Sequence, residues 1–240
     1  MKIGLLIPST STGRDWNSYQ DTYLYNLSLK TFLITYDKEH EYIFYVGIDR
    51  GDKIYDNPEN IEGFNRFVSV MENVTIDFVY MDGIEKGYLT KMWNRLYEKA
   101  YAENCDYFFQ CGDDIAFRTN GWINECIKKI LSSKGLGMTG PINNNPYILT
   151  QTFVSRKHME IFGYYFPEEL INWYCDDWIN EVYKERKLYF PLIRHFCENI
   201  GGDPRYNIHN DTNFQNNSSA KRAMIRHLCS QLVIRDVVKI

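Results

Sequence analysis

The sequence has no long apolar run and no excess of basic residues, and each absence argues against a class of protein. No apolar stretch approaches the ~20 residues that a membrane-spanning helix needs. Lys and Arg number 27 against 31 Asp and Glu, which gives a net charge of −4. The chain therefore lacks the positive balance that favours nucleic-acid binding. We expect no transmembrane segment and no nucleic-acid partner.

Metal-binding and secretory cysteine patterns are also missing. None of the six cysteines forms a C-x-x-C pair, which argues against a zinc site. The N-terminus, MKIGLLIPST, turns polar after a short apolar run and has no signal-peptide cleavage site. We expect reduced thiols, a soluble chain and a cytoplasmic location. The residues do not indicate an oligomeric state.

The chain is long enough for one domain with a sizeable core, and we expect a single domain over residues 1–240. Residues 1–140 alternate between apolar runs and segments of helical period. Such alternation predicts an α/β fold with a Rossmann-like, mainly parallel sheet flanked by helices. The predicted strands are 2–8, 41–49, 74–81 and a fourth in 105–117, and the predicted helices are 20–36, 59–72, 88–103 and 119–132.

Residues 141–240 show a different pattern and read as a smaller elaboration of the same domain. The segment GPINNNPY reads as a loop, and ILTQTFVSR reads as a strand. Residues 172–186 predict an amphipathic helix, and KLYFPLIRHF predicts a strand interrupted by Pro191. A closing helix begins at Ser218 or Ser219, either of which can cap it.

The stretch CDYFFQCGDDIAF, residues 105–117, carries the strongest functional signal. An apolar run ends in Gly112, Asp113 and Asp114, and ligands of open α/β sheets bind at the carboxyl ends of strands. Two acids on a loop suit Mg²⁺ or Mn²⁺, which bind one or two carboxylates together with substrate phosphates. Gly-Asp-Asp is also good turn chemistry, so a simple turn is the alternative.

This stretch resembles the Asp-x-Asp region of GT-A fold glycosyltransferases, and the order of other segments resembles family 2-like members. LLIPST resembles the first strand and nucleotide turn, YVGIDRGD the second strand, and GYLTKMWNRLYEKA the donor-side helix. TFVSRKHMEIFGYY resembles the acceptor side, WYCDDWINEVY the acidic motif, and LYFPLIRHF the late strand. The resemblance spans residues 2–197. It departs from the family pattern at Gly112, where that pattern has an acid.

The resemblance implies a metal-dependent transfer of a sugar from a nucleoside-diphosphate sugar to a glycan or other hydroxyl acceptor. The implied general base is Asp177, with Asp176 orienting the acceptor. A retaining enzyme would need no such base, so the resemblance favours inversion, while the residue types leave the stereochemistry open. The implied metal ligands are Asp114 and either His195 or His209. The implied donor-binding residues are Thr10, Arg14, Asp49, Lys91, Asn94 and Asp113.

Several of these residues can also have a purely structural role. Asp49 can belong to a charged turn with Arg50 and Asp52, and Lys91 and Asn94 can lie on a solvated helix face. Asp176 and Asp177 can stabilise a helix dipole from the first turn.

Three other functions remain open from the sequence. A sugar nucleotidyltransferase needs a Gly-rich basic loop after the first strand, and IPSTSTGRDW is a poor version of one. A non-catalytic nucleotide- or sugar-binding protein can use the same scaffold. A dinucleotide oxidoreductase is disfavoured because no G-x-G-x-x-G follows a predicted strand.

Overall fold

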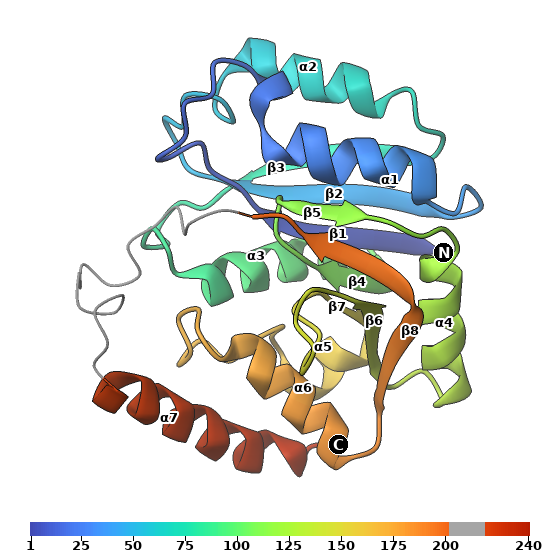
Figure 1. The fold of residues 1–240 in the computed structure, drawn as a ribbon, viewed down its shortest axis with the longest axis vertical. Helices are drawn as coiled ribbons and strands as arrows, with labels where there is room; N and C mark the ends of the chain where they lie inside the picture. Colours follow the sequence, from blue (N-terminus) through green and yellow to red (C-terminus); the bar gives the residue numbers. More distant parts are fainter. Residues whose placement is uncertain (202–218) are drawn as a thin grey trace.

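The computed structural model describes residues 1–201 and 219–240 and shows a mixed α/β fold around one eight-stranded sheet (Figure 1). The strand order is β3-β2-β1-β4-β7-β6-β8-β5. Pairs β1–β2, β2–β3, β1–β4 and β6–β8 are parallel, and β4–β7, β6–β7 and β5–β8 are antiparallel. The strands are β1 Lys2–Pro8, β2 Glu41–Ile48, β3 Val74–Tyr80, β4 Tyr107–Gln110, β5 Ile115–Phe117, β6 Met138–Ile142, β7 Thr152–Ser155 and β8 Tyr189–Asn199.

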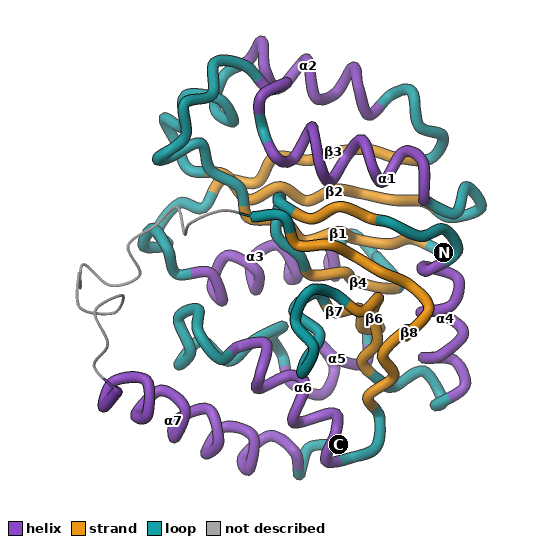
Figure 2. Tube along the Cα trace, in the orientation of Figure 1, coloured by secondary structure: helices purple, strands orange, loops and turns teal. Residues whose placement is uncertain are grey.

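Helices cover both faces of the sheet (Figure 2). Alternate residues of β1 enter different apolar layers: Ile3, Leu5 and Ile7 pack with α1, α2 and α4, whereas Leu6 packs with α3 and α6. Burial on both faces explains the continuous apolar runs in the sequence. The helices are η1 Tyr19–Asp21, η2 Leu24–Leu29, α1 Lys30–Thr35, α2 Pro58–Val68, α3 Leu89–Ala102, α4 Trp122–Ser132, α5 Lys157–Phe162, α6 Cys175–Glu185 and α7 Ser219–Val237.

The predicted α/β class and mainly parallel sheet are confirmed. In the described part of the chain, no helix combines the length and apolar character needed to cross a bilayer. The predicted helix 20–36 is instead a short 3₁₀ turn, a π-helical segment and a single α-helix in succession.

Two strand predictions are wrong in part. Residues 140–147 were expected to be a loop, but β6 includes Pro141 and Ile142. Pro141 is tolerated because the pairing with β7 involves only Met138 and Thr139. The late strand was expected to end near residue 196, but β8 continues to Asn199, because its last residues pair with β5.

Candidate functional site

The carboxyl ends of β1, β2 and β4 meet at one edge of the sheet. All three strands are parallel, and β1 lies between the other two. The chain crosses from β1 to β2 on one side and later returns to place β4 on the other side, which is the arrangement that leaves a crevice for ligands. The turns that follow these strands, residues 9–14, 49–53 and 111–114, carry most of the polar side chains described below.

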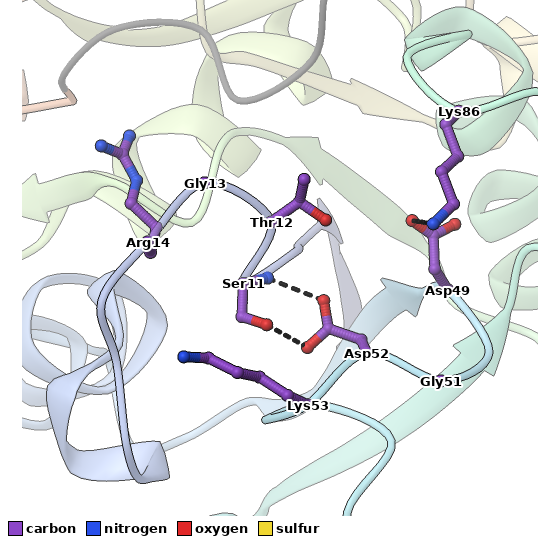
Figure 3. Close-up of a pocket in the computed structure, with 9 residues that line it drawn as sticks. All are labelled: Ser11, Thr12, Gly13, Arg14, Asp49, Gly51, Asp52, Lys53 and Lys86. Atoms are coloured by element: carbon purple, nitrogen blue, oxygen red, sulfur yellow. Dashed lines mark hydrogen bonds and ion pairs between the residues drawn. The ribbon is translucent and has the colours of Figure 1, made fainter.

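The first cavity, here called the β1–β2 cavity, has a volume of about 300 Å³. Figure 3 shows the turn after β1 facing the turn after β2, with Lys86 reaching Asp49 from a third segment. Its lining contains acids, hydroxyls and cations, which suits a polar, charged ligand. The lining residues are Ser11, Thr12, Gly13, Arg14, Asp49, Gly51, Asp52, Lys53 and Lys86.

Asp52 holds the two turns of the β1–β2 cavity together. Its carboxylate accepts hydrogen bonds from the Ser11 backbone N–H and hydroxyl, each at 2.7 Å, and from the Thr10 hydroxyl at 3.0 Å. The backbone N–H groups of Ile54 and Tyr55 also donate to it at 3.0 Å. Burial alone would raise the Asp52 pKa, but these donors together lower it below the ordinary value, so Asp52 is a fixed anion.

Three predicted donor-binding residues belong to this region. Asp49 is almost fully buried, with the Lys86 ammonium 3.9 Å from its carboxylate. The Arg14 guanidinium lies 5.1 Å from the centre of the Tyr23 ring. Thr10 is buried behind the cavity, and its hydroxyl hydrogen-bonds two residues that line it, Thr12 and Asp52, each at 3.0 Å. The structure thus brings Thr10, Arg14 and Asp49 together.

The Gly112–Asp114 turn follows β4 and separates its two acids. Asp113 is fully buried, and its backbone carbonyl accepts the Ser28 hydroxyl at 2.8 Å. Asp114 is more exposed, and its backbone carbonyl accepts the Ile200 N–H at 3.0 Å. A Cβ atom placed on Gly112 would lie 2.5 Å from the Asp114 Oδ1. Glycine at this position therefore leaves room for the Asp114 carboxylate.

The donor set at this turn fits a cation only if the substrate supplies most of the ligands. Among the described residues, no group of three or more His, Cys, Asp or Glu side chains could hold a metal ion. Asp114 offers one partly exposed carboxylate, and Asp113 is buried beside the Tyr55 hydroxyl, 3.5 Å from its Oδ2. Mg²⁺ is commonly bound in this way, by one or two carboxylates plus phosphates and water.

The second cavity, here called the β4–α6 cavity, has a volume of about 240 Å³ and lies beyond β4 on the same edge. Thr150 Oγ1 in its wall is shielded from solvent and has no hydrogen-bond partner in the described part of the chain. The hydrogen-bonding capacity of this hydroxyl is therefore unsatisfied among the described residues. The lining residues are Trp93, Gln110, Thr150, Asn172, Trp173, Cys175 and Asp176.

Asp176 is the acid of the β4–α6 cavity. Burial, and then the neighbouring charge of Asp177, raise the pKa of Asp176 to about 6. Asp177 does not line this cavity; it is half-buried, and its charge interacts with Glu181, Lys184 and Arg226. Both acids lie in the first turn of α6, which begins directly after the left-handed residue Tyr174.

Lys91 and Asn94 line neither cavity. The Lys91 ammonium lies 3.8 Å from the Glu168 carboxylate and 4.4 Å from the centre of the Tyr88 ring. The buried Asn94 amide accepts the backbone N–H groups of Tyr165 and Phe166, each at 3.0 Å, and donates to the Phe166 carbonyl at 2.9 Å. In this structure Asn94 holds the 165–166 segment in place.

Of the two candidate histidine ligands, only His195 lies in the described part of the chain, and it lies apart from Asp114. His195 lines a different cavity, formed by α4 and β8. It precedes Asn199, which pairs with Ile115 next to Asp114, by four residues. At ~3.3 Å per extended residue this is roughly 13 Å. His209 lies outside the described residues.

Several site residues could not be selected from the sequence. In the sequence Asp52 is one of several charged residues in the turn after β2. Its structural role becomes visible only from the five hydrogen bonds that its carboxylate accepts. Gln110 and Trp93 occupy positions that the apolar patterns of β4 and α3 predict as core. Trp173 precedes the predicted acidic motif, and its side chain is 46% exposed, which is a weak signal for a binding platform.

Comparisons with known proteins identify the fold. The sequence matches no family model and no curated protein. The structure is similar to a crystal structure of S. aureus TarS 1–349 in complex with UDP-GlcNAc, with a TM-score of 0.54 and 12% identity over 85% of this chain. The complex of the same TarS fragment with UDP gives a TM-score of 0.52 and 14% identity over 82% of this chain.

The likeness to TarS shows a glycosyltransferase-like fold and nothing finer, because the sequence identity is so low. The matched region covers 60% of the TarS chain in both structures, so this chain spans about three fifths of the length of the proteins it resembles.

Proposed function

We propose that the protein is a nucleotide-sugar glycosyltransferase that uses a divalent cation and transfers a hexose-type sugar to a hydroxyl acceptor with inversion. The single observation that carries the proposal is the pair of cavities at one sheet edge, the edge at which β4 also ends in the turn that bears Asp114. The complexes of TarS with UDP and UDP-GlcNAc, on a similar fold, support this choice of ligand.

The β1–β2 cavity would take the nucleoside diphosphate. Asp49 can accept hydrogen bonds from a base edge or a ribose, and Asp52 fixes the turn that faces it. Arg14, Lys53 and Lys86 supply positive charge to the same cavity, which suits phosphate oxygens. The strands from β2 to β7 span three inter-strand spacings, or ~14 Å, so one extended donor can reach from this cavity towards the next.

Asp114 would hold the cation, with Asp113 behind it and the donor phosphates completing the ligands. A bound Mg²⁺ or Mn²⁺ would supply charge neutralisation for the departing diphosphate. The protein's own contribution is the geometry of the turn: Gly112 leaves space for the Asp114 carboxylate.

The β4–α6 cavity would take the transferred sugar and the acceptor hydroxyl. Trp93 and Trp173 offer apolar ring faces for a sugar. Asp176 is the favoured general base, because it lines this cavity whereas Asp177 does not. The acceptor oxygen would bond to the anomeric carbon, its proton would pass to the Asp176 carboxylate, and the bond to the diphosphate would break. One displacement of this kind inverts the anomeric centre.

A thermal-shift panel of UDP, GDP, CDP, dTDP and their sugars, with and without Mn²⁺, tests this proposal. A ligand that binds only the folded state, at 100 times its Kd, stabilises it by ~2.7 kcal/mol. We expect a Mn²⁺-dependent shift with one nucleotide that is reduced in Asp114→Ala. Absence of any shift would overturn the proposal. A shift without release of the nucleoside diphosphate, across a panel of acceptors, would favour the non-catalytic binding protein instead.

A further inference from the structure

A third cavity, here called the α4–β8 cavity, lies away from the proposed donor and acceptor sites. Its volume is about 470 Å³, which exceeds that of the β1–β2 cavity. In Figure 1, α4 and the middle of β8 lie on the right, near the start of β1, whereas the carboxyl end of β1 points to the left. The lining residues are Glu125, Lys128, Lys129, Pro191, Leu192, Ile193, Arg194 and His195.

An irregularity in β8 forms one wall of this cavity. Pro141 of β6 pairs with Leu192, but the next residue, Ile142, pairs with Phe196. Ile193, Arg194 and His195 are therefore left out of the pairing with β6. In a regular strand, Arg194 and His195 would point to opposite faces of the sheet. The bulge places both of them on the same cavity.

The opposite wall comes from one face of α4. Glu125, Lys128 and Lys129 are spaced three and four residues apart, so their side chains lie on the same side of the helix. Lys128 pairs with Glu125 at 3.5 Å. The cavity thus has three cationic side chains, Lys128, Lys129 and Arg194, against one carboxylate.

Two of the three cations of this cavity have no acidic partner inside the described chain. Lys129 and Arg194 form no ion pair there, whereas Lys2, Arg50 and Lys99 each have an acidic partner. The Nδ1 atom of His195 is shielded from solvent and also has no hydrogen-bond partner among the described residues. Unpaired cations on two facing walls disfavour a metal ion and favour an anion.

We propose that the α4–β8 cavity is a second ligand site, for a small molecule that carries a phosphate group beside an apolar portion. Arg194 and Lys129 bind the phosphate from the two walls, and the His195 ring donates a further hydrogen bond. Pro191, Leu192 and the 75% exposed Ile193 form an apolar floor for the rest of the ligand. This inference does not rest on the proposed transferase activity, since the two sites share no residue.

Titration of the whole chain with phenyl phosphate, inorganic phosphate and phenol tests the site by backbone amide NMR. We expect saturable shifts confined to residues 125–129 and 192–196, with phenyl phosphate binding more tightly than phosphate and phenol not binding. Arg194→Gln and Lys129→Gln should each weaken phenyl phosphate binding about tenfold, as the loss of a charge-assisted contact does. Lys38→Gln, at an exposed lysine outside the cavity, is the matched control and should bind like the wild type.

Two outcomes would overturn the proposal. Shifts that map to other segments would show that the phosphate binds elsewhere. Equal weakening by Lys38→Gln and Arg194→Gln would show that only overall charge matters. Circular dichroism of the Gln variants establishes that they are folded, and because both replaced side chains are at least partly exposed, we expect them to fold normally.

Discussion

Asp52 and Asp176 are the same residue type at the same edge of the sheet, but their surroundings move their pKa values in opposite directions. Asp52 accepts five hydrogen bonds, and its pKa is lowered despite its burial. Asp176 is shielded next to a second acid without comparable donors, and its pKa rises to about 6. Donors thus make one carboxylate a fixed structural anion, whereas desolvation makes the other a group that can exchange a proton near neutral pH.

The opposite pKa shifts of Asp52 and Asp176 favour different tasks for the two carboxylates. A carboxylate whose lone pairs are already occupied positions a turn and has little capacity left for chemistry. A carboxylate with a pKa of about 6 is still mostly ionised at pH 7, and it is a stronger base than an ordinary Asp. The predictions below test whether Asp176 and Asp52 differ in this way.

The largest expected effect is on turnover in Asp176→Asn. If Asp176 is the general base, kcat should fall by roughly 10²–10⁴-fold, the usual contribution of such a group, while donor Kd changes little. Steady-state kinetics together with calorimetric donor binding measure both quantities. Asp177→Asn is the matched control, because this neighbour does not line the cavity. A larger loss of kcat in Asp177→Asn would move the base to Asp177.

The next effect is on stability in Asp52→Ala. Removal of a charged acceptor leaves the donors of Ser11, Ile54 and Tyr55 without their partner, at a cost of about 3 kcal/mol. Urea unfolding at pH 7 measures the loss. The exposed Asp15→Ala is the control and should cost under about 0.5 kcal/mol. A loss in Asp52→Ala no larger than the control's would show that the hydrogen bonds do not hold the turns.

The regular part of the fold could be predicted because it depends on periodicity. Apolar runs of β1 and β2 are buried on both faces, so each appears in the sequence as an unbroken stretch, whereas the edge strand β3 is only partly buried and carries polar residues between its apolar ones. The strand β6 escaped prediction because Gly140 and Pro141 interrupt its pattern. Its place between β7 and β8 depends on pairing with residues far along the chain.

The sequence points to one edge of the sheet but does not resolve individual roles. The acids after β4 were predicted from the rule that ligands bind at carboxyl ends of strands, and Asp49 and Arg14 from the resemblance to GT-A fold glycosyltransferases. Neighbouring acids are harder to separate, because sequence spacing cannot show that Asp176 lines a cavity and Asp177 does not. The bulge at residues 193–195 of β8, which includes His195, also depends on long-range pairing.

A smaller effect is expected in the pH dependence of stability, and its sign separates the two acids. The raised pKa of Asp176 means that the folded state holds a proton that the unfolded state releases between about pH 4 and 6. Stability should therefore fall across this window by roughly 2 kcal/mol, and Asp176→Asn should remove that fall. For Asp52, whose pKa is lowered, the contribution is present above about pH 4 and is lost as the pH falls further.

Urea unfolding from pH 3 to 8 measures both dependences. Asp176→Asn should be as stable as the wild type at pH 4 and more stable at pH 8, whereas the deficit of Asp52→Ala should shrink only in strong acid. Parallel curves for the wild type and Asp176→Asn would contradict the raised pKa. In the proposed enzyme, kcat/KM should rise with pH through about 6, because the base must be deprotonated.

The smallest effect is expected in Gly112→Ala. The new Cβ would lie 2.5 Å from the Asp114 Oδ1, so the carboxylate has to rotate away from its present position. For the nucleotide that the thermal-shift panel selects, the Mn²⁺-dependent part of the affinity should fall by about 3- to 10-fold, which is a coupling typical of residues in contact. Calorimetry with and without Mn²⁺ measures this affinity.

In an Asp114→Ala background the Gly112→Ala change should have no effect on affinity, because the carboxylate that it displaces is gone. An equal loss in both backgrounds would mean that Gly112 acts through the backbone of the turn and not through Asp114.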